Sequence, residues 1–185
     1  MKNPEIIQNI FSDEDFNKLK NYLKDHELLK KVSFDENGRR GVHSINDPVL
    51  NDYSSKLLPI ARSFFESETL KTSYTLFTEY SDTNINLPKH KDLNACTYTI
   101  DLVLYQNKPW GLWVDGIEYL VNENEALLFY GEDQEHWRET VENNDNIVGV
   151  IFFHYVEPEH WYFTKGPEYV RELIEMKQKE LGMLA

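Results

Sequence analysis

The sequence predicts a mainly β protein with flanking helices, in which short antiparallel strands form a sandwich or jelly roll. Three observations support this fold class. From about Thr72 the chain becomes rich in β-branched and aromatic residues. Turn residues separate the strand candidates at intervals of about ten residues, as in sandwiches and jelly rolls. Before Thr72 and after Val156, apolar residues recur at helical spacing.

The predicted organisation is a single domain over residues 1–185. An N-terminal helical support is expected over 1–70, the β core over 72–156 and a C-terminal helix over 166–183. A chain of 185 residues with 41% hydrophobic residues is long and apolar enough to bury a core. We find neither an internal repeat nor a Gly/Ser/Pro-rich linker that would divide it.

Charge and cysteine content exclude several classes of function. The formal net charge of −13 disfavours nucleic-acid binding, which needs a basic face. The single cysteine, Cys96, cannot form an internal disulfide and fits a reducing compartment. No apolar stretch approaches the ~20 residues of a membrane helix. We therefore expect a cytoplasmic protein without a membrane partner.

Two helices are predicted in the first third. Ser12 begins a Ser-Asp-Glu-Asp run that suits a helix start, and helical spacing continues to about Leu29. The run 35–38, Asp-Glu-Asn-Gly, predicts a turn. A second helix is expected from Asp47-Pro48 to about Glu66.

Six strands follow from the β-branched and aromatic runs, with Asp115-Gly116 as a tight hairpin between two of them. Their expected ranges are Ser73–Tyr80, Cys96–Tyr105, Gly111–Val114, Ile117–Val121, Ala126–Tyr130 and Ile147–Val156. The last predicted element is a charged helix over Glu168–Leu181.

Three residues form a candidate metal site: His90, Asp92 and His136. Residues two apart in a strand share a face, so the side chains of His90 and Asp92 point the same way. His136 is expected near the start of another strand. Two imidazoles and one carboxylate are the facial ligand set of non-heme Fe(II) oxygenases, although zinc also accepts such ligands. A His-x-Asp triplet also arises by chance.

These residues resemble those of the Fe(II)/2-oxoglutarate-dependent dioxygenases, in particular the prolyl-4-hydroxylase-like group. The resemblance covers about Thr72 to Val156 and rests on Tyr80, His90 with Asp92, the run 99–107, and His136. It implies a double-stranded β-helix (cupin-like) core, with Fe(II), 2-oxoglutarate and O2 as cofactor and cosubstrates. The implied reaction is oxidation of a C–H bond while 2-oxoglutarate decarboxylates to succinate.

The cation that would bind 2-oxoglutarate is not where this family usually has it. The family places an Arg or Lys on the last strand, at a position that Asn146 occupies here. Between His90 and Val156 the basic candidates are Lys91, Lys108 and Arg138. We expect Lys91 to face away from the metal and Lys108 to lie in a loop. Arg138 is the preferred anchor, because it shares strand parity with His136 and an Arg pairs bidentately with a carboxylate. The alternative is that Arg138 pairs with a structural carboxylate.

Other residues are candidates for supporting roles. Tyr80, Tyr98 and Tyr105 could offer a hydroxyl to the same carboxylate. His154 could act near the metal, although a satisfied core histidine is the commoner outcome. The run 39–41, Arg-Arg-Gly, reads as a polar loop whose arginines could bind an acidic group of the substrate or remain solvated.

Three functions remain open. The leading hypothesis is a hydroxylase of a peptidyl or small-molecule substrate, dependent on Fe(II) and 2-oxoglutarate. A cupin-like metalloenzyme that does not use 2-oxoglutarate is the second, and the residue at position 146 favours it. The third is a non-enzymatic jelly-roll binding module that would use its tryptophans as stacking surfaces. The sequence indicates neither the substrate nor the oligomeric state.

Overall fold

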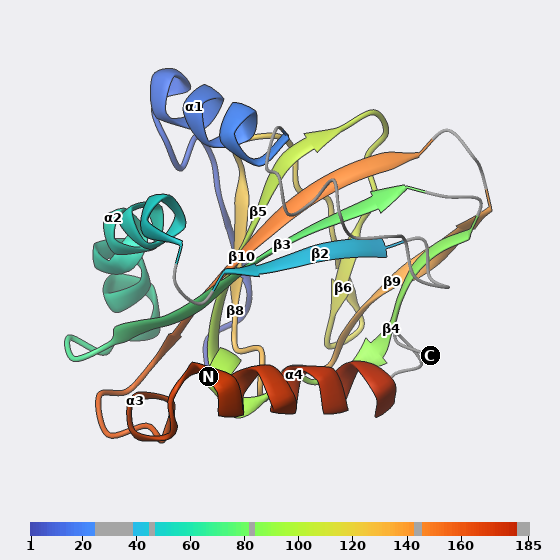
Figure 1. Ribbon diagram of the computed structural model, residues 1–185. Helices are drawn as coiled ribbons and strands as arrows, with labels where there is room; N and C mark the ends of the chain where they lie inside the picture. Colours follow the sequence, from blue (N-terminus) through green and yellow to red (C-terminus); the bar gives the residue numbers. More distant parts are fainter. Residues whose placement is uncertain (25–38, 45–46, 82–83, 143–145, 181–185) are drawn as a thin grey trace.

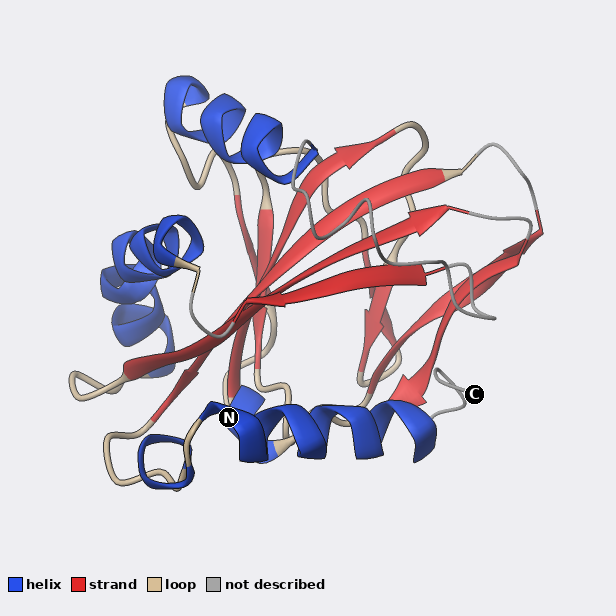
Figure 2. Ribbon diagram, viewed as in Figure 1, coloured by secondary structure: helices blue, strands red, loops and turns tan. Residues whose placement is uncertain are grey.

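The computed structural model describes residues 1–24, 39–44, 47–81, 84–142 and 146–180. Strands dominate this part of the chain, and helices flank them (Figures 1 and 2). The strands are β1 (Glu5–Ile7), β2 (Arg39–Ser44), β3 (Lys71–Ser81), β4 (Asn84–His90), β5 (Tyr98–Gln106), β6 (Leu112–Val114), β7 (Ile117–Tyr119), β8 (Ala126–Phe129), β9 (His136–Glu142) and β10 (Ile147–Val156). The helices are α1 (Asp13–Lys24), α2 (Pro48–Phe65), the short α3 (Tyr162–Lys165) and α4 (Pro167–Glu180), and a 3-10 turn covers Asn94–Cys96.

The strands form two antiparallel sheets. The larger has six strands in the order β1-β8-β5-β10-β3-β2, and the smaller has four in the order β4-β9-β6-β7. Consecutive strands β3 and β4 belong to different sheets, as do β8 and β9. A chain that passes back and forth between two facing sheets in this way is typical of a jelly roll. The mainly β fold with flanking helices is therefore confirmed.

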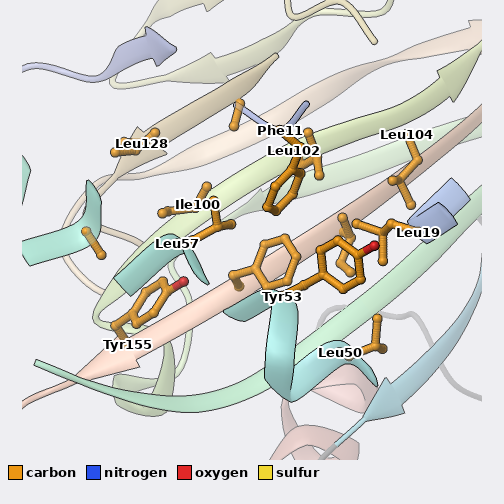
Figure 3. Packing of buried hydrophobic residues seen from close by; sticks show 14 of the residues in the cluster. Phe11, Leu19, Leu50, Tyr53, Leu57, Ile100, Leu102, Leu104, Leu128 and Tyr155 are labelled. Carbon is orange, nitrogen blue, oxygen red and sulfur yellow. The ribbon is translucent and has the colours of Figure 1, made fainter. Parts of the chain in front are cut away.

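Helices α1 and α2 cover the outer face of the larger sheet. Figure 3 shows Tyr53 and Leu57 of α2 near Ile100 and Leu102 of β5. Leu57 is 1% exposed, and replacing so buried a leucine with alanine typically lowers stability by about 2–5 kcal/mol. The outward-facing side chains of β5 are therefore structural.

The inner face of the larger sheet packs against the smaller sheet. This inner cluster includes Val103, Val148 and Val150 from the larger sheet and Leu87 and Val114 from the smaller. A third cluster lies under α4, where Val170 and Ile174 pack against residues including Tyr74, Ala95 and Cys96. Helix α4 thus covers the edge of the space between the sheets.

Several sequence predictions agree with the structure at the level of single contacts. Asp47 caps α2, because its Oδ1 accepts hydrogen bonds from the backbone N–H groups of Val49 and Leu50. Ser12 Oγ accepts one from the N–H of Asp15 at the start of α1. Asp115 and Gly116 both have positive φ, 49° and 82°, as the predicted tight hairpin requires.

Other elements differ from the predictions. β1 and β2 add two strands within the region expected to be a helical support, and β2 includes the Arg-Arg-Gly run expected to be a loop. β4 and β9 were not predicted as complete strands, because polar residues interrupt their alternation. Residues 96–97, expected in a strand, precede β5, which begins at Tyr98. The predicted turn at 35–38 and the end of the first helix lie outside the described residues.

Within the described ranges, no helix has the length and apolar character to cross a bilayer.

Candidate metal centre

His90 and His136 lie directly opposite each other on neighbouring antiparallel strands. His90 is the last residue of β4, His136 is the first of β9, and the two are partners in the strand register. Their ring centroids are 4.3 Å apart. The structure therefore brings together two imidazoles that are distant in the sequence, at the end of one strand pair.

Backbone carbonyls orient both rings. His90 Nδ1 lies 2.7 Å from the carbonyl oxygen of Pro88, and His136 Nδ1 lies 2.9 Å from that of Gln134. A carbonyl oxygen can only accept, so each Nδ1 carries the proton of the hydrogen bond. In the neutral rings this leaves the Nε2 lone pairs available, as metal ligation requires.

Asp92 completes the cluster. Its Oδ1 lies 3.5 Å from His90 Nε2 and 3.6 Å from His136 Nε2. One ligand atom from each of the three residues lies within 4.8 Å of the others, which is close enough for one ion to contact all three. Asp92 follows β4, and its backbone N–H donates to the carbonyl of Gly131 at 2.9 Å. These donors fit a divalent transition metal.

The charges in the cluster favour the metal-binding form of the carboxylate. Burial opposes ionisation of Asp92, but the charges and hydrogen bonds of His136 and His90 outweigh it and hold the pKa of Asp92 well below its usual range. Burial lowers the pKa of His136, yet the Asp92 carboxylate raises it further, so the net shift is upward. A metal ion at Nε2 would therefore compete with the proton that this shift favours.

Two residues that the sequence did not identify position His136. Gln134, whose carbonyl orients the His136 ring, donates through Nε2 to Asp115 Oδ2 at 3.0 Å and accepts at Oε1 from the N–H of Tyr130 at 2.9 Å. Asp115 Oδ1 also accepts from the N–H of Glu135 at 3.1 Å. The only available signal was the Asp-Gly pair, which predicts the hairpin but not this contact.

A cavity opens beside the three candidate ligands. Its wall combines the inner face of β3, including Tyr80, with Phe152 and His154 of β10 and with Ile174 and Lys177 of α4. Arg39 of β2 also lines it. Among the described lining residues, the acidic side chain is Asp92 and the permanently cationic ones are Arg39 and Lys177. No sequence pattern indicates that α4 reaches this cavity.

His154 lies on the cavity wall and is held by Thr99. The Thr99 hydroxyl donates to the carbonyl of Cys96 and lies 3.2 Å from His154 Nδ1, so it accepts from that nitrogen. Burial lowers the pKa of His154 to about 4, which keeps the ring neutral at pH 7. Asp92, Cys96 and His154 form a second group with metal-ligand spacing. Burial raises the pKa of the Cys96 thiol well above its usual range, which disfavours the thiolate that binds metals.

Arg138 faces the interior, as its parity predicts, but its guanidinium is engaged by protein groups. Nη2 lies 3.1 Å from Asp101 Oδ2, and Nη1 donates to the carbonyl of Trp110 at 2.5 Å. Both side chains of the ion pair are 1% exposed. The pair joins β9 of the smaller sheet to β5 of the larger sheet. Arg138 does not line the cavity described above, and these contacts favour the structural alternative.

The three candidate tyrosines lie in different places. Tyr80 is buried on the cavity wall and packs edge-on against Trp110. Tyr98 and Tyr105 belong to the cluster on the opposite face of the larger sheet, and Tyr105 donates to Glu79 Oε2 at 2.5 Å. The structure does not bring these two hydroxyls to the cavity.

The other three positions considered for the anchor also lie away from the cavity wall. Lys91, which directly follows His90, is exposed. Lys108 is exposed in the loop between β5 and β6. Asn146 is buried directly before β10, and its Oδ1 has no hydrogen-bond partner among the described residues.

Comparisons with known proteins relate the fold to solved structures. No family model and no curated protein sequence matches the chain. EctD from S. alaskensis with bound Fe is similar with a TM-score of 0.68 and 12% identity, over 83% of this chain and 72% of EctD. HygX from Streptomyces hygroscopicus, with nickel and 2-oxoglutarate bound, gives a TM-score of 0.61 at 11% identity, over 84% and 83% of the two chains.

A prolyl-4-hydroxylase from Pseudomonas putida is also similar, with a TM-score of 0.58 and 12% identity over 82% of this chain and 91% of the hydroxylase. Together these structures confirm that the chain has the fold of iron- and 2-oxoglutarate-dependent oxygenases, and hence a double-stranded β-helix core. At such low identity the likeness concerns the fold.

Proposed function

We propose that this protein is an Fe(II)- and 2-oxoglutarate-dependent dioxygenase. It would hydroxylate a C–H bond of a peptide or small-molecule substrate while 2-oxoglutarate decarboxylates to succinate. The observation that carries the proposal is the arrangement of His90, Asp92 and His136, with both Nε2 atoms facing one carboxylate oxygen. The oxygenase fold supports it, because HygX, which shares this fold, binds nickel and 2-oxoglutarate.

Each group of residues around the site would have its own role. His90, Asp92 and His136 would hold the iron, which supplies the oxidising chemistry with 2-oxoglutarate and O2. The apolar wall that includes Leu87 and Phe152 would exclude water from the reacting atoms. His154, which is neutral at pH 7, would add no charge beside the iron. A cytoplasmic location remains a prediction from the single cysteine.

Succinate formation tests the proposal directly. Purified protein is incubated with Fe(II), 2-oxoglutarate and O2, and succinate is measured with and without candidate substrates. We expect wild type to form succinate even without substrate, at a slow rate, and Asp92→Ala to form none. Asp133→Ala is the matched control, because Asp133 is an exposed aspartate close to the site, and it should behave as wild type. Absence of succinate from wild type would contradict the use of 2-oxoglutarate.

The second candidate is a cupin-like metalloenzyme that binds its substrate without 2-oxoglutarate. Two observations favour it: Asn146 stands where the resemblance implies a cation, and Arg138 is paired with Asp101. In that case the same three residues would bind a metal ion. Adding 2-oxoglutarate would then leave the absorption spectrum of the bound metal unchanged. Anaerobic titration of the Fe(II)-loaded protein with 2-oxoglutarate separates the two functions.

A further inference from the structure

We propose that Arg39 on β2 is the cation that pairs with the carboxylate of 2-oxoglutarate remote from the metal. The inference rests on the proposed function and assigns a residue to its cosubstrate. 2-Oxoglutarate is a dianion, and a carboxylate that leaves water for a protein cavity needs a hydrogen-bonded cation. The cation must therefore be found among the residues that line the cavity beside His90, Asp92 and His136.

Among the basic side chains that the structure describes, two remain as candidates for this cation. Arg138 holds Asp101 and the Trp110 carbonyl within the protein and does not line the cavity. Lys108 is exposed on a loop, also away from it. Arg39 and Lys177 are the permanently cationic side chains of the described cavity wall.

The strand register places Arg39 on the inner face of the larger sheet. Arg39 on β2 lies opposite Tyr80 on β3, and Tyr80 lies opposite Val148 on β10. Directly opposed residues share a face of the sheet, so these three side chains form one row across it. Tyr80 is buried on the cavity wall. Arg39 therefore points to the same side, beside the Tyr80 ring.

This row also accounts for the absence of a cation on β10. Val148, the β10 member of the row, is apolar and fully buried, and it cannot bind a carboxylate. The guanidinium two strands away at the sheet edge supplies a charge to the same side of the sheet. Because an arginine side chain is long, its charged end can extend over the aromatic ring of its neighbour while the base of the side chain stays at the edge.

Arg39 suits the role better than Lys177. The planar guanidinium can bind both oxygens of a carboxylate, whereas an ammonium acts as a point charge. Lys177 belongs to the covering helix α4. Arg39 instead belongs to β2, which pairs over all six of its residues with β3, the strand whose inner face forms part of the cavity wall.

The test compares two ligands that differ only in the remote carboxylate. 2-Oxoglutarate and 2-oxopentanoate share the keto-acid end, but 2-oxopentanoate has a methyl group in place of the remote carboxylate. Both are titrated by calorimetry into the Ni(II)-loaded protein, so the readout is affinity and not turnover. We expect wild type to prefer 2-oxoglutarate by about tenfold to a hundredfold, the usual value of a charged hydrogen-bonded pair.

Arg39→Gln should remove this preference, because it should weaken the binding of 2-oxoglutarate and leave the binding of 2-oxopentanoate unchanged. Arg39→Lys should restore part of the preference. A variant that merely disturbed the fold would weaken both ligands. Arg171→Gln is the control, because Arg171 is an exposed arginine paired with Glu168 outside the cavity.

Two results would overturn the assignment to Arg39 alone: a preference that survives in Arg39→Gln, or one that disappears in Lys177→Gln. If wild type binds metal but shows no preference for 2-oxoglutarate, the proposed function falls as well. If Arg39→Gln fails to fold, Arg39→Lys decides the question through the same ratio of affinities. An unchanged ratio in that variant, with both affinities at wild-type values, would count against a bidentate guanidinium.

Discussion

The backbone of Gly131 lies so close to Asp92 that a β-carbon at position 131 would sit 2.5 Å from the Asp92 carboxylate oxygen Oδ2. It would also lie 2.6 Å from the carbonyl oxygen of Cys96 and 2.7 Å from the Thr99 hydroxyl. The carbonyl of Gly131 accepts the hydrogen bond from the N–H of Asp92. Because Gly131 has no side chain, there is room beside it for the carboxylate of Asp92, the candidate metal ligand.

Gly131→Ala should lower the affinity for Fe(II), because the methyl group would displace the Asp92 carboxylate from the two imidazoles. A loss of about tenfold to a hundredfold is expected, as for other disturbed metal-ligand supports. Anaerobic titration with Fe(II) measures it. Gly111→Ala is the control, since its β-carbon would meet mainly the flexible Glu118 side chain, away from the metal ligands. Equal affinities in wild type and Gly131→Ala would contradict this account.

Asp115 should matter for metal binding although it does not touch the candidate ion. Asp115→Ala removes the acceptor of the Gln134 side chain, and the Gln134 carbonyl orients the His136 ring. We expect Fe(II) affinity to fall by about tenfold or more, with a smaller effect on the melting temperature. Asp115→Asn, which retains an acceptor oxygen, should recover part of the affinity. The prediction fails if the alanine variant loses only thermal stability.

The candidate ligands could be predicted because metal chemistry restricts the residue types. Only a few types of side chain bind Fe(II), so His90, Asp92 and His136 could be selected from the sequence as candidates. Their register could not be predicted, since it depends on pairing between β4 and β9. Polar residues such as Lys89 and Glu139 interrupt the apolar alternation of both strands.

Arg39 and Arg138 show a further limit of the sequence. Arg39 occurs in a charged, glycine-containing run, which reads as a loop until β3 is known to pair with it. The parity of Arg138 correctly predicted an inward side chain. Its partner Asp101 lies 37 residues away on another sheet, and no local pattern joins the two.

His154 should make stability depend on pH. Its pKa is lowered by burial from an ordinary 6.5 to about 4 in the folded protein, so the unfolded chain binds a proton more readily between these values. The contribution of neutral His154 to the free energy of unfolding is therefore fully present above about pH 6.5, and it is lost as the pH falls towards 4. The total loss should be roughly 3 kcal/mol, at about 1.4 kcal/mol per pKa unit.

Urea unfolding between pH 7 and pH 4, with a chelator present, measures this loss. His154→Gln cannot take up the proton, so its stability should decline less steeply over the same range. The two proteins should differ most in slope between pH 6.5 and 4, where His154 changes charge on unfolding. Parallel pH profiles would show that His154 is not the group responsible.

The buried pair of Arg138 and Asp101 should be a structural connection between the two sheets. Arg138→Met leaves the Asp101 carboxyl buried without its cation, which typically lowers stability by about 3–5 kcal/mol. Burial already raises the pKa of Asp101 against the opposing effect of Arg138. Protonation of Asp101 at low pH should therefore relieve part of the loss.

The double variant Arg138→Met/Asp101→Leu separates this role from cosubstrate binding. It removes both charges and should regain most of the stability, because apolar side chains can replace a buried ion pair. If Arg138 is structural, the folded double variant will keep the wild-type preference for 2-oxoglutarate over 2-oxopentanoate. If Arg138 binds the cosubstrate carboxylate, the same variant will fold and lose that preference, and the assignment to Arg39 would then be wrong.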